Sequence, residues 1–449
     1  MRLKNRISLI NIFIYLTIFG YWYNLPVIKT SAFGGYNEFR IYDITFVVLI
    51  LLLIRHKNLK KNLRSLAGDS SLKDIYRFAI WASIMTIPTL IYVGILGNFV
   101  YAGMTVIFLY HLWGFILLSA LVVTYYDKDS ILPLIRWFMI LSSIHLVLYY
   151  LQISGIIGNL WPQVYIDSYG DDALSGTLGP NRVTPGMMTL MGFILSIFII
   201  LNKFASRFLR LISWFNLILA LPAFIMIGSR TTFVTLAIFA IVFVFFYRIK
   251  LAPVILILTP LFILIYSKGL DSNQKERITK NIEWNERKLL RGGDYNDLSV
   301  IEGYENLGSN RAQILERYVP YLLDNFYFIP FGSGFNNRIL ASTTGAASAH
   351  NIYLSLINEV GIVGLIFYLQ WLGSYFVFEK RLYPLRTYYR AKGIMSSLSI
   401  AMFISLFAGE HLYVYRPCFA ILGTFLFVSS IMKICQQETN DLSTNIGTP

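Results

Sequence analysis

Residues 99–126 read FVYAGMTVIFLYHLWGFILLSALVVTYY, and they contain no Asp, Glu, Lys or Arg. A helix needs about 20 mostly apolar residues to cross the hydrocarbon core of a bilayer. This stretch is longer than that and carries no charge into the lipid, so it predicts a transmembrane helix. Tyr125 and Tyr126 stand at its end, where aromatic rings favour the membrane interface.

Comparable apolar stretches recur along the whole chain. The chain is 56% hydrophobic and 14% charged, whereas a soluble domain is about 25% charged. The sequence therefore predicts an all-α polytopic integral membrane protein with one large periplasmic loop that contains short helices. Hydropathy predicts about twelve spans, at residues 7–28, 38–54, 76–96, 99–126, 131–157, 184–202, 209–228, 231–247, 251–267, 352–378, 394–413 and 416–435.

The Lys and Arg residues of the loops set the orientation. With the N-terminus inside, the loops on that side hold 23 basic residues and the short loops on the other side hold five. Basic residues collect in cytoplasmic loops, so both termini are expected in the cytoplasm of a cell whose inner membrane holds the protein. Because residues 7–28 lack a small-residue cleavage site and further spans follow, they are interpreted as a first span and not as a signal peptide.

This topology divides the chain into four regions. They are a bundle of nine spans at 1–267, a large periplasmic loop at 268–350, three C-terminal spans within 351–435 and a polar cytoplasmic tail at 436–449. The tail is expected to be disordered, since it is mostly polar and has too few apolar residues for a core.

Several classes of function are excluded by composition and by missing motifs. The net charge of +14 does not indicate nucleic-acid binding, because the basic residues fall in short loops between apolar runs. Cys418 and Cys435 lie about 25 Å apart on one predicted helix, so they cannot form a disulfide. No Walker A or zinc motif is found, and the acidic pair Asp171-Asp172 has no evident third ligand, so neither a metal nor a cofactor is expected.

The large loop contains helix and turn signals. Ser309-Asn310 predicts an N-cap for a helix that starts at Arg311, and Pro320 is expected to end or kink that helix. Gly332-Ser333-Gly334 predicts a tight turn. Ser348 predicts the N-cap of a helix that carries His350 in its first turn and continues into the membrane.

His350 is the strongest candidate for chemistry. The positive end of a helix dipole disfavours protonation, so a histidine at a helix start stays neutral and can take a proton from an attacking hydroxyl. The same helix start can hold a phosphate. A surface histidine without a role would occupy the same position.

Two arginines are candidates for binding an anion. Arg230 lies in Gly228-Ser229-Arg230, at the outer junction of two spans, with no acidic residue nearby in the sequence. It either binds an anion or extends toward lipid headgroups. Arg311 opens its helix on the same side, where the dipole disfavours a cation, so its position indicates a ligand or an ordinary solvated charge.

Other residues are weaker candidates. Arg182 and Arg416 also face outward near the membrane, and His411 is a possible supporting group beside Glu410. His111 and His145 lie within spans and are expected to bond to neighbouring helices. The small residues in Gly361-Ile362-Val363-Gly364 are expected to let two helices pack closely.

Taken together, these motifs resemble the bacterial O-antigen polymerase and O-antigen ligase family of the Wzy and WaaL type. The resemblance covers residues 175–378. Its main motif is Ala349-His350-Asn351-Ile352-Tyr353-Leu354-Ser355-Leu356-Ile357-Asn358-Glu359-Val360-Gly361-Ile362-Val363-Gly364, and the supporting motifs are Arg311 with Phe331-Gly332-Ser333-Gly334, Gly228-Ser229-Arg230 and Gly179-Pro180-Asn181.

The resemblance implies a metal-independent glycosyltransferase that uses undecaprenyl-diphosphate-linked glycan. His350 would activate the acceptor hydroxyl, and Arg230 and Arg311 would neutralise the diphosphate leaving group. Arg182, His411, Arg416, Asn351 and Tyr353 are possible secondary residues. Membrane lipids and a chain-length regulator protein are the expected partners, and nucleic acid is not.

The class of reaction stays open at this point. A polymerase and a ligase share these motifs, and the Ile-, Phe-, Tyr- and Asn-rich composition favours the polymerase only by association. A lipid-linked glycan flippase should show ionisable groups at the membrane midplane and paired broken helices, whereas Asp43, Glu359 and Glu410 lie near predicted span ends. A metal-dependent transferase would need acidic residues in the first outer loop, which holds only Glu38.

Overall fold

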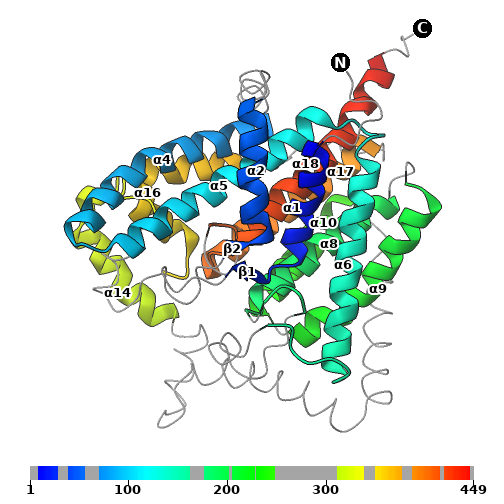
Figure 1. The fold of residues 1–449 in the computed structure, drawn as a ribbon, viewed down its shortest axis with the longest axis horizontal. Coiled ribbons are helices and arrows are strands. Elements are labelled where there is room, and N and C mark those ends of the chain that lie inside the picture. Colours follow the sequence, from blue (N-terminus) through cyan, green and yellow to red (C-terminus); the bar gives the residue numbers. More distant parts are fainter. Residues whose placement is uncertain are drawn as a thin grey trace.

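The computed structural model is an α-helical bundle (Figure 1). The end of α18 lies at the top right of Figure 1, whereas α14 lies at the lower left and the strands β1 and β2 lie near the centre. The structure describes residues 9–28, 39–55, 70–161, 176–179, 181–201, 205–227, 229–247, 311–337, 349–376, 387–414 and 419–444.

The N-terminal half of the chain contributes most of the bundle. Its elements are α1 (Leu9–Trp22), β1 (Pro26–Ile28), β2 (Phe39–Arg40), α2 (Ile41–Arg55), α4 (Ser70–Ile95), α5 (Phe99–Tyr125), α6 (Leu132–Ile153), α8 (Val183–Leu201), α9 (Arg207–Ile227) and α10 (Arg230–Tyr247). The two short strands pair antiparallel, with Pro26 opposite Arg40.

The second half adds the elements that surround His350. They are α14 (Arg311–Asp324), the 3-10 helix η3 (Phe326–Phe328), α16 (Ile352–Gly373), α17 (Thr387–Ser405), the 3-10 helix η4 (Leu406–Ala408) and α18 (Phe419–Thr444). α18 packs against α1, α5, α8 and α17. The described side chains of α18 are almost all buried, so this helix runs through the centre of the bundle.

Six helices are long and apolar enough to cross a membrane, namely those in Leu72–Ile95, Phe99–Tyr125, Leu132–Ile153, Val183–Leu201, Arg207–Ile227 and Ile352–Gly373. Five shorter apolar helices coincide with further predicted spans, at Leu9–Trp22, Ile41–Leu52, Thr231–Val244, Ala391–Ser405 and Ala420–Cys435. The predicted span at 251–267 lies outside the described residues. The chain is thus a mostly helical protein with at least these six candidate membrane spans.

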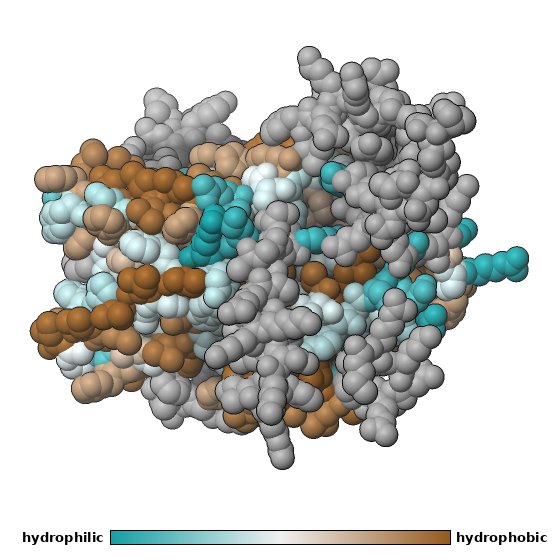
Figure 2. Space-filling model, turned by 90° about the horizontal axis from the view of Figure 1, so that it is seen from above, coloured by the Kyte–Doolittle hydropathy of each residue, from teal (hydrophilic) through white to brown (hydrophobic). Residues whose placement is uncertain are grey.

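The outer surface of the bundle is apolar, as a bilayer requires. On α4, Ile84, Ile87 and Ile91 are 49%, 58% and 59% exposed. Their spacing of three and four residues places them on one face of the helix. Figure 2 shows apolar side chains over much of the outer flanks, with patches of hydrophilic residues between them. An exposed apolar face of this length would be unfavourable in water and is stable in lipid.

Polar side chains hold helices together inside the bundle. The Asn216 side-chain amide of α9 donates to the Ser142 hydroxyl of α6 at 2.8 Å and accepts from the Ser196 hydroxyl of α8 at 3.3 Å. Gly192 has no side chain to block this contact, because a Cβ there would lie 2.3 Å from the Ser142 hydroxyl. Hydrogen bonds of this kind help helices associate in a membrane.

One prediction for a segment outside the core is wrong. Residues 436–444, expected to be disordered, continue α18 as a helix to Thr444. Pro320 was expected to end or kink α14. It does not end the helix, which continues to Asp324.

Candidate active site

His350 lies immediately before α16, in an unusual backbone conformation. It has a φ of 48°, in the left-handed region that non-glycine residues rarely adopt, and its side chain is exposed. Asn351 is the N-cap of α16, and its side-chain oxygen accepts hydrogen bonds from the backbone N–H groups of Tyr353 at 3.0 Å and Leu354 at 3.4 Å. The prediction that His350 lies inside the first helical turn is therefore wrong, and Ser348 lies outside the described residues. A residue with positive φ cannot continue a right-handed helix.

Tyr353 anchors the first turn of α16 to α17. Its hydroxyl donates to the backbone oxygen of Phe403, and its ring packs against Phe403 and Phe407 with centroid distances of 5.5 Å and 4.5 Å. The side chain is 8% exposed. These contacts give Tyr353 a structural role beneath His350 and leave little of its surface for a substrate.

Helix α16 is broken at Gly361, and the glycine turn of the large loop fills the break. Gly361 has a φ of 69° and a ψ of −177°, which interrupts the helical hydrogen bonds. The N–H of Ile362 donates to the oxygen of Ile329 at 2.8 Å. In the other direction, the N–H of Ser333 donates to the oxygen of Asn358 at 2.7 Å. We define residues 329–337 as the wedge.

The glycines of the wedge allow this close approach. A Cβ on Gly332 would lie 2.5 Å from the backbone oxygen of Glu359, and a Cβ on Gly361 would lie 2.4 Å from the carbonyl carbon of Phe331. The small residue at Gly361 was predicted to let two helices pack closely. The structure shows close packing of a helix against a loop, in a backbone conformation that only glycine adopts easily.

Glu359 joins the wedge, α16 and the segment after α17. Its Oε2 accepts from the backbone N–H of Asn336 at 3.0 Å and from the Tyr413 hydroxyl at 3.1 Å. The side chain is 1% exposed. Glu359 lies about 10 Å along the helix from its start. This joining role of Glu359 was not predicted from the sequence. A signal for it exists, because Asn351, Ser355 and Glu359 recur at four-residue spacing and so predict a polar stripe on one face of α16.

Residues 409–414, which we call the re-entrant segment, follow η4 and are not helical although they lie inside the bundle. The predicted span at 394–413 is therefore too long, because α17 ends at Ser405. Glu410 is 5% exposed and accepts a hydrogen bond from the Ser355 hydroxyl of α16. His411 is 2% exposed, and its Nε2 lies 3.1 Å from the Ser405 hydroxyl. His411 is thus buried beside the end of α17.

The helix starts that carry the predicted arginines converge on this region. α10 begins at Arg230 and α14 begins at Arg311, which confirms the predicted start of the loop helix. A Cβ on Gly186 would lie 2.3 Å from the Thr232 hydroxyl, so the start of α8, next to Arg182, packs against the start of α10. Arg182 is partly buried and interacts electrostatically with Tyr149. The side chains of Arg230 and Arg311, and all of Arg416, lie outside the described residues.

Helix α14 reaches the same place through an apolar contact. Its buried Tyr318 and Leu322 pack in one cluster with Ala349, the residue before His350. Leu354 and Ile357 of α16 extend this cluster. The structure therefore brings together the elements that carry Arg311 and His350, and burial of these side chains stabilises the contact.

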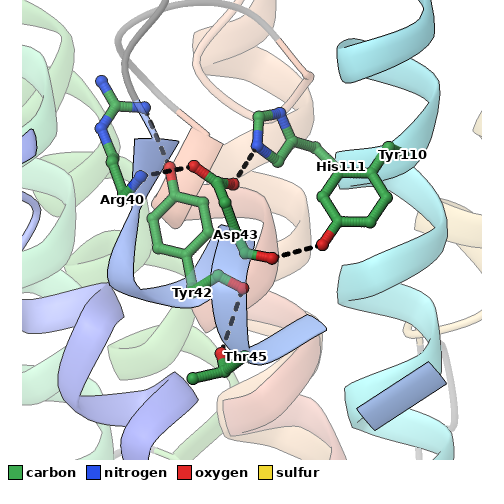
Figure 3. Close-up of polar contacts among 6 residues, drawn as sticks. All are labelled: Arg40, Tyr42, Asp43, Thr45, Tyr110 and His111. Carbon is green, nitrogen blue, oxygen red and sulfur yellow. Dashed lines mark hydrogen bonds and ion pairs between the residues drawn. The ribbon is translucent and has the colours of Figure 1, made fainter. Parts of the chain in front are cut away.

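A second buried polar cluster lies on α2 and α5 (Figure 3). The His111 Nε2 bonds to the Asp43 Oδ1, which confirms that this histidine bonds to a neighbouring helix. The other Asp43 oxygen accepts from the backbone N–H of Arg40 at 2.7 Å, and the Arg40 Nη1 donates to the Tyr42 hydroxyl at 3.0 Å. Asp43 and His111 are each 3% exposed, so this cluster has no surface to offer a substrate.

His145 has a different kind of partner from the one expected. Its Nδ1 lies 2.9 Å from the hydroxyl of Thr177, which belongs to the short described segment 176–179 between α6 and α8 and not to a helix. Within the described parts of the chain, no group of three or more His, Cys, Asp and Glu side chains is arranged to hold a metal ion. Metal independence stays a prediction.

Part of the chain is similar to a known protein family. None of the curated proteins compared with the chain matches it. Residues 215–369, from within α9 to within α16, match a family model described as O-antigen ligase. The matched segment includes Arg230, Arg311, the wedge and His350, and the family comprises glycosyltransferase-like enzymes of O-antigen assembly. Residues 215–369 are therefore similar to the O-antigen ligase family, which agrees with the resemblance to the Wzy and WaaL type.

Proposed function

We propose that the protein is an O-antigen polymerase, which joins undecaprenyl-diphosphate-linked repeat units at the periplasmic face of the inner membrane. The observation that carries the proposal is the presentation of His350. It is exposed, it has positive φ, and the Asn351 cap fixes the helix behind it. Strained backbone at an exposed polar residue is typical of functional sites.

The proposed reaction needs only groups of this chain. The acceptor hydroxyl oxygen attacks the anomeric carbon of the donor while its proton passes to the His350 imidazole. The bond between that carbon and the diphosphate oxygen breaks, and its electron pair leaves with the diphosphate. Arg230 and Arg311 neutralise the developing charge, and fixed cations are most effective where water is scarce.

A transporter function is less well supported, even though α16 is a broken helix. Transporters use such breaks to hold ions or substrates at exposed half-helix ends. Here the wedge occupies the break. Its carbonyl oxygens, those of Ile329 and Pro330, accept hydrogen bonds from the N–H groups of Ile362 at 2.8 Å and Val363 at 3.4 Å. The half-helix start that would bind an anion is already capped by the chain itself.

Deletion of the gene distinguishes polymerase from ligase. We expect lipopolysaccharide whose lipid A-core carries a single repeat unit, as seen on a gel. Bare core, with long glycan retained on the lipid carrier, would show that the protein is a ligase. Normal long chains in the deletion strain would exclude both functions.

Substitution of His350 tests the catalytic assignment. His350→Asn and His350→Gly should both remove polymer, with the protein still inserted. Asparagine and glycine tolerate positive φ better than alanine does, so both variants should keep the backbone conformation before α16 without added strain. Long-chain polymer in either variant would contradict the role of His350.

In a purified assay, EDTA should leave turnover unchanged, and complete loss of turnover with EDTA would contradict a metal-free reaction.

A further inference from the structure

The re-entrant segment lies between two helices that carry proposed site residues. Its residues Glu410, His411, Leu412, Tyr413 and Val414 are between 0% and 5% exposed. Non-helical backbone inside a membrane bundle is tolerated only where the protein or enclosed water satisfies its polar groups. Tyr368 of α16 meets part of this need, because its hydroxyl donates to the oxygen of Leu412 at 2.8 Å.

On one side, Glu410 is tied to the helix of His350. The hydroxyl of Ser355 donates to the Glu410 Oε1, and Ser355 is 2% exposed. Ser355 lies one helical turn beyond the Asn351 cap, so its side chain projects from the same face of α16 as that of Asn351. The carboxylate therefore holds the half of α16 that begins just after His350.

On the other side, the same segment lies against the helix of Arg230. A Cβ on Gly409 would lie 3.8 Å from the Thr231 Cγ2, which is ordinary contact distance. Thr231 directly follows Arg230 in the first turn of α10, and α10 packs along α17. The segment therefore touches both helix starts, with Gly409 beside the start of α10 and Glu410 bonded to Ser355 of α16.

The charge of Glu410 suits this place. A buried carboxylate is costly unless other groups compensate it, and the Ser355 hydroxyl supplies one hydrogen bond. Helix starts carry partial positive charge, which favours an anion and disfavours a cation such as Arg230 at the start of α10. A carboxylate bonded to Ser355, near the start of α16, is favoured by the partial positive charge of that helix start.

We infer that Glu410 is a positioning residue, which fixes the start of α16 relative to the start of α10 so that His350 and Arg230 act on the same donor. The inference rests on the proposed function. Misplacement of reacting groups by about 1 Å can lower a rate on the order of 100-fold. The effect should appear in kcat more than in KM, since Glu410 itself is buried and does not touch the substrate.

The test compares variants in purified protein reconstituted in lipid, with undecaprenyl-diphosphate-linked repeat unit as substrate. Glu410→Gln keeps the size of the side chain and can still accept from Ser355, but it removes the charge. We expect kcat per folded molecule to fall about 10–100-fold with KM changed far less. Ser355→Ala, which keeps the charge, should lose less, and Glu410→Asp should recover part of the loss.

Asp43→Asn is the matched control, because it neutralises another buried carboxylate. That carboxylate bonds to His111 of α5 and to the backbone N–H of Arg40 in β2. It should alter stability and leave turnover per folded molecule unchanged. An Asp43→Asn loss as large as that of Glu410→Gln would overturn the inference, as would wild-type kcat in Glu410→Gln. His350→Asn in the same assay separates the two proposals. If it is active, the proposed function fails. If it is inactive while Glu410→Gln turns over normally, only the role of Glu410 fails.

Discussion

Two neighbouring residues before α16 have opposite backbone conformations. His350 is left-handed, with a φ of 48°, whereas Asn351 is extended, with a φ of −140°. The Asn351 side chain then satisfies two N–H groups that the first helical turn leaves without partners. The left-handed turn at His350 therefore lies directly before a capped helix start.

Removal of the Asn351 cap should lower both stability and activity. Asn351→Ala should cost about 1 kcal/mol, which is typical for the loss of an N-cap side chain. It should also reduce turnover, because the backbone next to His350 loses its anchor. Asn351→Asp should retain both, since a carboxylate accepts the same N–H groups and interacts well with the helix dipole. Thermal unfolding and polymerisation rates of the purified variants check this.

Asn98 offers the matched control for that prediction. It caps α5, where its side chain accepts from the N–H of Tyr101 at 3.1 Å. Asn98→Ala should show a similar loss of stability with little change in turnover per folded molecule. Equal losses of turnover in both variants would mean that Asn351 acts only through overall stability.

At the residue scale, the sequence predicted which histidine stands at a helix start but not how it stands there. The helix was expected to begin earlier, at Ser348, because serine is a strong N-cap signal. Asn351 gives the same signal three residues later, and local preference alone cannot choose between the two. Glu359 and Glu410 were missed as parts of the site, since their partners Tyr413, Asn336 and Ser355 are distant in the sequence.

At the scale of elements, the distinctive feature is the break in α16 and the wedge that fills it. The turn at Gly332-Ser333-Gly334 was predicted, but its partner was not, because Gly361-Ile362-Val363-Gly364 has the hydropathy of an uninterrupted span. Hydropathy reports whether a segment is buried in lipid or protein. It carries no information about a change in φ at a single glycine.

Gly361→Ala should therefore be strongly destabilising. The new methyl group would lie 2.5 Å from the oxygen of Pro330, in a backbone with a φ of 69°. Left-handed alanine and overpacking together should cost about 2–5 kcal/mol. The wedge should also detach from α16, which would expose it to protease in a detergent-solubilised sample.

Gly373→Ala on the same helix is the control for that substitution. Nothing lies within 4 Å of a Cβ at Gly373, so the change should stay within about 0.5 kcal/mol. If the two variants unfold at the same temperature and are cleaved at the same rate, the break at Gly361 does not hold the wedge in solution.

At the scale of the molecule, hydropathy predicted the fold class well. Six predicted spans coincide with helices able to cross a membrane, and five more coincide with shorter apolar helices. Helix ends were predicted poorly where a buried, non-helical segment carries apolar residues of its own, as Leu412, Tyr413 and Val414 do after the end of α17. Lipid and protein interior both favour apolar side chains, so hydropathy does not distinguish a helix end from a buried segment after it.

The orientation of the bundle provides the last prediction. Phe78 packs on Tyr368, and the Trp81 indole donates to the oxygen of Val360 at 2.7 Å, so α4 and α16 run antiparallel. Asn98, after α4, therefore lies at the same end as His350, whereas Asp129, after α5, lies at the opposite end. The charge bias of the loops predicts that the His350 end is periplasmic.

Single cysteines test this orientation once Cys418 and Cys435 are replaced by serine. In cells with a permeabilised outer membrane, an impermeant thiol reagent should label Asn98→Cys, and it should label Asp129→Cys only after lysis. Both positions are exposed, so access depends on the membrane and not on burial. The reverse pattern would place His350 in the cytoplasm, on the side away from the finished repeat units, and the proposed polymerase would then lack its substrate.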